Sequence, residues 1–245
     1  MAPPTDSPRY PSTLAPDAYY QGLVDRLTTA LLPTLDPFFS SLPVSSSAPL
    51  VLELASGNGT HASLFARTWK DIAVQPTECD SFGVKRIDET TSREGMTDRV
   101  RRAVKLDVMD DEDWKELQRE SADEEDGKRY ELVFGSNFLH MVPFPGAPQR
   151  IFRLLHTHSL VSPTAKLLIY GPFKSDSGFF SDSDASFDQI ISARPSPYPL
   201  GLRSVDALGR IAEAEGWKLS ERIAVAKGNW VLVFEQKEGR AGQVV

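Results

Sequence analysis

Two glycines that follow a short apolar segment constrain the fold of this chain more than any other feature. Residues 49–54 are apolar except for Glu53, and the run stops at Gly57 and Gly59. Such a run is typical of a buried strand in a parallel sheet. Glycine allows a tight turn and a close approach of a ligand, and the helix expected over residues 60–66 presents free N–H groups at the same point. The segment therefore predicts a strand, a ligand-binding loop and a helix in succession.

Apolar runs and amphipathic stretches alternate along the rest of the chain. Strands are expected at residues 71–76, 104–108, 130–135, 165–170, 219–225 and 231–234. Helices are expected at residues 81–90, near Trp114, and at residues 149–156 and 204–215. Repeated alternation indicates a parallel sheet covered on both faces, and the tight turn between the last two strands indicates that one strand is antiparallel. The predicted fold class is α/β, with a Rossmann-like sheet of seven strands and helices on both faces.

The sequence predicts one domain between two tails. Residues 1–16, rich in proline and serine, are expected to form a flexible lead-in, and residues 237–245 a C-terminal tail. Residues 17–236 are expected to form a single domain with a helical lid at its N-terminus. Pro33 and Pro37 are expected to limit the lid helix.

Composition narrows the class of partner. The 245 residues carry a formal net charge of −7, which disfavours binding to the phosphate backbone of nucleic acids. A single cysteine, Cys79, excludes an intramolecular disulfide. The first residues lack the pattern of a secretory signal, and no apolar run reaches the roughly 20 residues that span a bilayer. We therefore expect cytoplasmic residence and a small-molecule partner, with no nucleic-acid or membrane partner. The oligomeric state stays open.

Acidic residues stand at the expected ends of the first three strands. Glu53 lies in the first strand, Glu78 follows the second, and Asp107 ends the third. Ligands of open α/β folds bind outside the carboxyl ends of the strands, where a carboxylate can accept both ribose hydroxyls. Taken singly, each acid fits a surface position or a helix cap equally well, and Asp80 in particular fits an N-cap.

The pattern from Glu53 to Gly59 reads E-x-x-x-G-x-G and resembles the S-adenosylmethionine (SAM) loop of class I methyltransferases. SAM carries no phosphate, and a carboxylate can offset the ammonium of its amino acid end. The resemblance implies SAM as cofactor. Its binding residues would be Glu53, Ala55, Ser56, Gly57, Gly59 and Glu78, with Asp107 facing the adenine amino group.

Longer stretches resemble one family, the methyltransferase-like proteins of domain-of-unknown-function 938, which include methyltransferase-like protein 26. The matching stretches are residues 51–66 (VLELASGNGTHASLFA), 74–80 (VQPTECD), 106–108, 136–143 (SNFLHMVP), 168–173 (LIYGPF), 187–188 and 201–203. The resemblance implies a class I methyltransferase fold with strand order 3-2-1-4-5-7-6, and it implies no substrate. The chain departs from the family pattern at residues 16–20 and 226–230, on the expected substrate side.

His140 is the candidate catalytic residue. It follows the fourth strand, and an imidazole can take a proton from a hydroxyl or amine near neutral pH. The alternative is a structural role, in which the histidine forms hydrogen bonds with the backbone and so fixes the conformation of its loop. Asn137 is expected to orient the amino acid end of SAM or the same loop. His61 is expected to cap or pack, and the remaining histidines lack the spacing of a metal site, so no metal is expected.

The candidate substrate residues are spread over the chain. They are Tyr20, Phe173, Phe179, Arg203, Asn229 and Trp230. Residues 174–186 are expected to form a loop whose phenylalanines either line a pocket or anchor a surface. Asp188 and Arg203 are expected either to hold substrate or to form an ion pair with each other, and we favour the ion pair.

Three functions fit the sequence. The leading hypothesis is a SAM-dependent methyltransferase that methylates an oxygen or nitrogen of a small molecule in biosynthesis. The first alternative is a methyltransferase-like pericyclase or cyclase that transfers no methyl group, with or without SAM. The second alternative is a SAM-binding protein without turnover.

Overall fold

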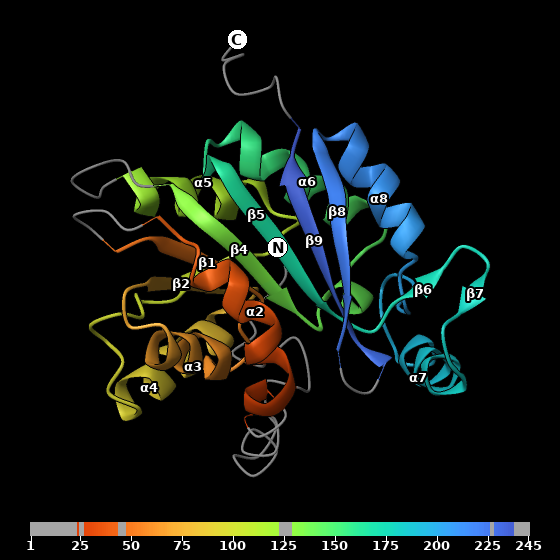
Figure 1. Ribbon diagram of the computed structural model, residues 1–245, viewed down its shortest axis with the longest axis horizontal. Helices are drawn as coiled ribbons and strands as arrows, with labels where there is room; N and C mark the ends of the chain where they lie inside the picture. The colour runs from red at the N-terminus through yellow and green to blue at the C-terminus, as the bar shows by residue number, and fades with distance from the viewer. Residues whose placement is uncertain (1–23, 25–26, 44–47, 123–128, 226–227, 238–245) are drawn as a thin grey trace. The chain divides into compact units, whose positions relative to one another are not determined.

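The computed structural model describes residues 24, 27–43, 48–122, 129–225 and 228–237 and shows an α/β fold (Figure 1). Among these residues, seven strands form one sheet in the order β3-β2-β1-β4-β5-β9-β8, which confirms the predicted order. The contacts within the chain divide it into a first unit that ends at Val133 and a second that begins at Phe134. The predicted single domain stays a prediction. The lead-in, Tyr20 and residues 238–245 of the predicted tail lie outside the described residues.

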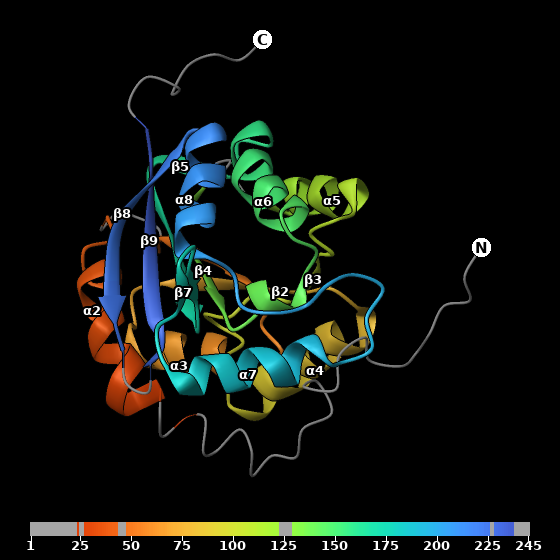
Figure 2. The same cartoon turned by 90° about the vertical axis from the view of Figure 1, so that its right-hand side faces the viewer.

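The first unit contains the glycine loop. Its elements are η2 (Leu27–Leu31), α2 (Leu32–Phe39), β1 (Leu50–Leu54), α3 (Thr60–Thr68), β2 (Ala73–Glu78), α4 (Ser81–Arg93), β3 (Val104–Lys105), α5 (Asp111–Ala122) and the start of β4 (Tyr130–Ser136). Strands β1, β2 and β3 are parallel. Helices α3 and α4 lie on one side of β2 and β3, and α5 lies on the other (Figure 2). All five residues of β1 are buried, as the apolar run predicts.

The helix before β1 continues through both prolines, so the prediction that they limit it was wrong. A π-helical turn, η2, leads into α2, which contains Pro33 in its first turn and Pro37 inside. Proline is tolerated in the first turn because its missing N–H has no partner there. Burial compensates for the second proline, since Phe39 stacks on Trp69 with ring centroids 4.0 Å apart. Packing of apolar side chains thus overrides the helix-breaking tendency of Pro37.

Strand β3 is shorter than predicted and leaves Asp107 outside it. The Asp113 carboxylate accepts hydrogen bonds from the Asp107 N–H at 2.8 Å and from the Lys105 ammonium at 2.9 Å. The Asp107 carboxylate accepts from the Met109 N–H at 3.0 Å. These side-chain acceptors compete with a strand ladder and fold the backbone into a turn before α5.

The second unit carries the antiparallel strands. After the end of β4 come η3 (Leu139–Met141), α6 (Gly146–Thr157), β5 (Val161–Gly171), β6 (Lys174–Ser175), β7 (Gly178–Phe179), α7 (Asp182–Ser192), α8 (Val205–Ala214), β8 (Trp217–Ala224) and β9 (Trp230–Gln236). Strand β9 is antiparallel to β5 and to β8, as expected from the tight turn. Helices α6 and α8 cover one face of β5, β9 and β8 (Figures 1 and 2).

The predicted loop at residues 174–186 is largely regular structure. Strands β6 and β7 form a short antiparallel hairpin, and α7 begins at Asp182. The Ser181 hydroxyl caps α7 by accepting a hydrogen bond from the Asp184 N–H at 3.1 Å. A serine followed by acidic residues is a helix-start signal that the sequence contained.

Trp217 is the main anchor of α6 on the sheet of the second unit. Its side chain is fully buried, and its indole N–H donates to the Phe152 carbonyl at 3.0 Å. We predict that Trp217→Ala lowers the free energy of unfolding by about 3–5 kcal/mol, because it leaves a cavity. Urea unfolding measures this, with Trp217→Phe as the control that keeps most of the volume. A loss below about 1 kcal/mol for the alanine variant would contradict the prediction.

Candidate functional site

The loop between β1 and α3 has an unusual backbone. Ala55, Gly57 and Gly59 all have positive φ angles, of 53°, 63° and 82°. A Cβ atom added to Gly59 would lie 3.0 Å from the Ile87 side chain, whereas one added to Gly57 would meet nothing within 4 Å. Gly59 is therefore needed to pack α3 against α4, and Gly57 leaves open space beside the backbone.

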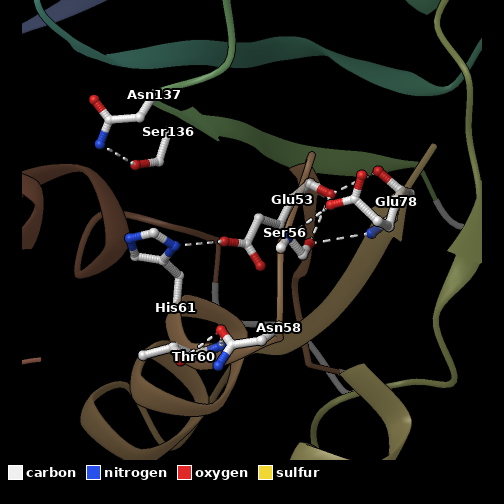
Figure 3. Close-up of polar contacts among 10 residues, drawn as sticks. Glu53, Ser56, Asn58, Thr60, His61, Glu78, Ser136 and Asn137 are labelled. Carbon is white, nitrogen blue, oxygen red and sulfur yellow. Dashed lines mark hydrogen bonds and ion pairs between the residues drawn. The ribbon is translucent and has the colours of Figure 1, made fainter. Parts of the chain in front are cut away.

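Polar side chains within the first unit fix this loop. The Ser56 N–H donates to the Thr77 carbonyl at 2.8 Å, and the Thr77 N–H donates to the Ser56 hydroxyl at 3.2 Å. The Asn58 side chain accepts from the Thr60 N–H at 3.2 Å (Figure 3). Ser56, predicted to bind cofactor, uses its side chain to tie the loop to β2.

Glu78 joins the end of β2 to the glycine loop. Its two carboxylate oxygens accept the N–H groups of Gly57 and Cys79, both at 2.8 Å. Burial raises the pKa of this carboxyl, and the two backbone hydrogen bonds act against that rise. Each carboxylate oxygen has a second lone pair, so Glu78 retains acceptor capacity for hydroxyl groups.

Gly83, in the first turn of α4, is a position that the sequence analysis missed. A Cβ atom there would lie 2.2 Å from the Glu78 Cγ. Asp80 caps the same helix by accepting from the Gly83 N–H at 2.7 Å, which is the N-cap that the sequence suggested. The sequence did contain a signal for this position. Gly83 follows the capping Asp80 by three residues and stands inside a helix, where a glycine is destabilising.

Glu53 is a buried carboxylate, and neither of its oxygens accepts a hydrogen bond from the residues that the structure describes. Its side chain is 1% exposed, and its nearest basic group is the His61 imidazole, with Nδ1 3.3 Å from Oε1 (Figure 3). Burying a charged group in this way is costly unless a partner compensates for it. His61, which the sequence predicted only to cap or pack, therefore forms a buried pair with Glu53.

Asn137 occupies the loop that follows β4 in the second unit. Its φ angle is 53°, and its N–H donates to the Tyr170 carbonyl at 2.8 Å. Its side-chain amide donates to the Ser136 hydroxyl at 3.3 Å (Figure 3). A small pocket lies here, lined by residues 137–140, 169–173 and Arg203. The pocket thus brings together Asn137, His140, Phe173 and Arg203, four of the predicted site residues.

His140 lies in this pocket with its imidazole largely buried. The ring packs edge-on against Phe187 at a centroid distance of 5.4 Å. Burial, with the positive charges of Arg203 and Arg194, lowers the pKa of His140 to about 4. The imidazole is therefore neutral at physiological pH and is a weak base.

Residues 198–203 hold the backbone on both sides of His140. The Arg203 side chain donates to the carbonyls of Leu139 and Val142, at 2.9 Å and 2.7 Å. The Gly201 N–H donates to the His140 carbonyl, and the Tyr198 hydroxyl donates to the Met141 carbonyl. Each carbonyl from residue 139 to 142 thus accepts a hydrogen bond from one short segment.

The prediction that Asp188 and Arg203 form an ion pair was wrong. Asp188 accepts a hydrogen bond from the Leu202 N–H, and Arg203 donates to backbone carbonyls instead. A guanidinium presents five donors in a fixed fork, so it can join several carbonyls of one loop. Asp188 and Arg203 both shape the loop around His140, by separate contacts.

The other substrate candidates of the second unit are less concentrated. Phe173 is buried, whereas Phe179 is 42% exposed. Trp230 packs against Phe180 with ring centroids 5.4 Å apart, and the Asn229 carbonyl accepts from the Val225 N–H in the turn before β9. Phe179, Asn229 and Trp230 are not among the residues that line the His140 pocket.

The residues that the structure describes contain no group of three or more histidine, cysteine, aspartate or glutamate side chains arranged to hold a metal ion. Within the same ranges, no helix combines the length and apolar character needed to cross a bilayer.

Strand order and the loop after β1 define this fold as that of a class I methyltransferase. The profile of the family described as "Protein of unknown function (DUF938)" matches residues 34–236, and the chain belongs to that family. An O-methyltransferase family protein from Burkholderia thailandensis is similar in structure, with a TM-score of 0.63 and 17% identity, over 85% of this chain and 57% of that one.

Two further solved structures share the fold. Mitomycin 7-O-methyltransferase matches with a TM-score of 0.61 and 14% identity, over 90% of this chain and 58% of its own. Human N-acetylserotonin methyltransferase, solved in complex with SAM, matches with a TM-score of 0.59 and 10% identity, over 77% of this chain and 48% of its own. The chain therefore spans about half to three fifths of the length of these proteins.

The contact between Gly83 and Glu78 leads to a stability prediction. Alanine normally stabilises a helix by about 1 kcal/mol relative to glycine, but at residue 83 it collides with the Glu78 side chain. We predict that Gly83→Ala lowers the melting temperature. The matched control is Gly209→Ala in α8, where the nearest atom is 4.0 Å away, and it should raise the melting temperature. Equal shifts in the two variants would contradict the contact.

The lowered pKa of His140 predicts a pH-dependent stability. Between about pH 6.5 and pH 4 the unfolded chain binds more protons at this residue than the native one. Its contribution is therefore fully present above about pH 6.5 and is lost as the pH falls toward 4. From about pH 7.5 to 5, the wild type should lose about 2 kcal/mol more than His140→Gln in urea unfolding. Parallel losses in both proteins would show that His140 keeps its ordinary titration.

Proposed function

We propose that this protein is a SAM-dependent methyltransferase that acts on a small molecule. One observation carries the proposal. The loop after β1 leaves open space at Gly57, and two buried carboxylates, Glu53 and Glu78, lie within the same unit at the ends of β1 and β2. Within the described part of the chain, no group donates a hydrogen bond to either oxygen of Glu53. A ligand with an ammonium group and neighbouring hydroxyls matches this arrangement.

The residues of the first unit fit the parts of SAM. Glu53 offers an unsatisfied carboxylate to the ammonium, and Glu78 offers its remaining lone pairs to the ribose hydroxyls. Gly57 provides the space for a close approach, and Asp107 is proposed to face the adenine amino group. When bound, SAM supplies a methyl group activated by its sulfonium.

The residues of the second unit fit the part of the reaction that involves the nucleophile. His140 is neutral, so it can accept a proton from the attacking group. Because its pKa is about 4, it suits an acidic nucleophile such as an enol or an electron-poor phenol. The hydrogen bonds from Arg203 fix the loop that carries His140, and fixed orientation is a major source of rate enhancement. The O-methyltransferases among the similar structures support an oxygen nucleophile.

A non-methylating cyclase is the second candidate. The low pKa of His140 favours it, because a weak base polarises a substrate oxygen more readily than it removes a proton. The departures from the family pattern in the sequence of residues 16–20 and 226–230 also favour it. Under this alternative the first unit binds SAM without transferring the methyl group, or binds a different ligand.

Cofactor binding is tested at Gly57. We predict that S-adenosylhomocysteine binds with one site per chain and that Gly57→Leu abolishes binding, because the side chain occupies the open space. Gly95→Leu is the matched control, since Gly95 also has a positive φ angle and open space around it. Isothermal titration calorimetry measures binding, and melting temperature measures the shared backbone strain. Absence of heat and of a thermal shift with the wild type would contradict the proposal.

Turnover separates the candidates. The wild type is incubated with SAM and small phenols, enols and amines, and S-adenosylhomocysteine is measured together with product. Methyl transfer yields both in equal amounts, and His140→Ala should lower the rate by about 10²–10⁴-fold while binding persists. Product without S-adenosylhomocysteine indicates the cyclase. Binding without any product across the panel indicates a SAM-binding protein that lacks turnover.

A further inference from the structure

The pair formed by Glu53 and His61 has features that the proposed cofactor site does not by itself require. Both side chains are buried, and the His61 Nδ1 lies 3.3 Å from the Glu53 Oε1 (Figure 3). No other basic side chain among the described residues lies within 4 Å of this carboxylate. Among the residues that the structure describes, His61 is therefore the basic group placed to compensate a negative charge on Glu53.

We propose that His61 carries the positive charge that balances Glu53 in the ligand-free protein, and that it releases its proton when a ligand's ammonium binds Glu53. The inference rests on the proposed function, because it takes the amino acid end of SAM or S-adenosylhomocysteine as the ligand. His61 is then a positioning residue that acts through Glu53. Cofactor binding becomes coupled to pH.

The reason for the exchange is electrostatic. One buried carboxylate can compensate one cation at low cost, and two cations beside it repel each other. An α-ammonium keeps its charge near neutral pH, whereas an imidazole readily loses its proton there. The neutral ring still offers an N–H donor to Glu53 in one tautomer, so the carboxylate stays oriented after the proton leaves.

The position of His61 in α3 also favours loss of its proton when an ammonium binds Glu53. It is the second residue of the helix, where the free N–H groups and the helix dipole disfavour a cation. The Glu53 carboxylate offsets this effect for a protonated ring. Once an ammonium shares that carboxylate, the helix dipole favours the neutral form of the imidazole.

Other charged groups on the elements that surround this pair have partners of their own. On β2, Glu78 binds the N–H groups of Gly57 and Cys79. On α2, Asp36 accepts from the Trp69 indole at 2.9 Å. On α4, Asp88 accepts from the Ala103 N–H, and on α3 itself Arg67 pairs with Glu94. These groups contribute a background charge, and the exchange itself involves Glu53 and His61.

The experiment measures protons released on binding. S-adenosylhomocysteine is titrated into the full-length wild type between about pH 6 and pH 8, in pairs of buffers with different ionisation enthalpies. We expect release of up to about one proton per site at the acidic end, with affinity falling up to about tenfold per pH unit there. The second probe, 5′-methylthioadenosine, lacks the amino acid end and should bind without proton release.

Variants assign the proton. His61→Gln keeps an N–H donor but cannot titrate, so its affinity should lose the pH dependence and its binding should release no proton. His158→Gln, at the end of α6, is the matched control and should behave as the wild type does. If His61→Gln does not fold, the His61 ring signals in the wild type replace it, because NMR should show a charged ring before binding and a neutral one after.

The outcomes distinguish the two proposals. If S-adenosylhomocysteine does not bind, the proposed function fails. If it binds and releases no proton, the proposed function stands and the exchange is overturned. Proton release that persists in His61→Gln would also overturn it, because the proton would then come from another group, such as a protonated Glu53.

Discussion

The hydrogen bond from the Gly57 N–H to the Glu78 carboxylate is the interaction on which the conformation of the glycine loop depends. It closes the glycine loop onto the end of β2, and Ser56 and Thr77 reinforce the same connection. The bond is possible only because residue 83 lacks a Cβ atom, which would otherwise displace the Glu78 side chain. A loop with three positive φ angles in five residues is thereby held in one conformation by the protein's own side chains. Preorganisation of this kind lowers the entropic cost of binding.

The two buried carboxylates of the first unit play opposite parts. Glu78 uses its oxygens to accept two backbone N–H groups, which offset part of the rise in pKa that burial causes. Glu53 accepts no such hydrogen bonds from the described residues, and His61 lies beside it. The first carboxylate therefore builds the loop, and the second is the group that we propose to bind a ligand's ammonium. An acidic residue at a strand end can serve either purpose, and here its neighbours decide which.

In the second unit, one side chain organises the region around the candidate base. Arg203 joins two carbonyls that flank His140, and its charge also contributes to the low pKa of the imidazole. The arginine thus fixes the position of His140 and its protonation state together. A reaction that uses His140 would have to suit a neutral, weakly basic imidazole.

The sequence by itself determined the α/β class, the strand order implied by its resemblance, the glycine loop and the acids at the strand ends, because these depend on local periodicity and on turn chemistry. It also contained the caps at Asp80 and Ser181, although only the first was recognised. The tertiary structure alone decided the rest. Pro37 stays inside α2 because aromatic packing outweighs its helix-breaking effect. Asp188 binds the Leu202 N–H, and Arg203 binds carbonyls more than 60 residues away in sequence. His61 becomes the partner of Glu53 because α3 folds back onto the end of β1. Hydrogen bonds and charges between distant segments follow from the packing of those segments, and no local pattern records them.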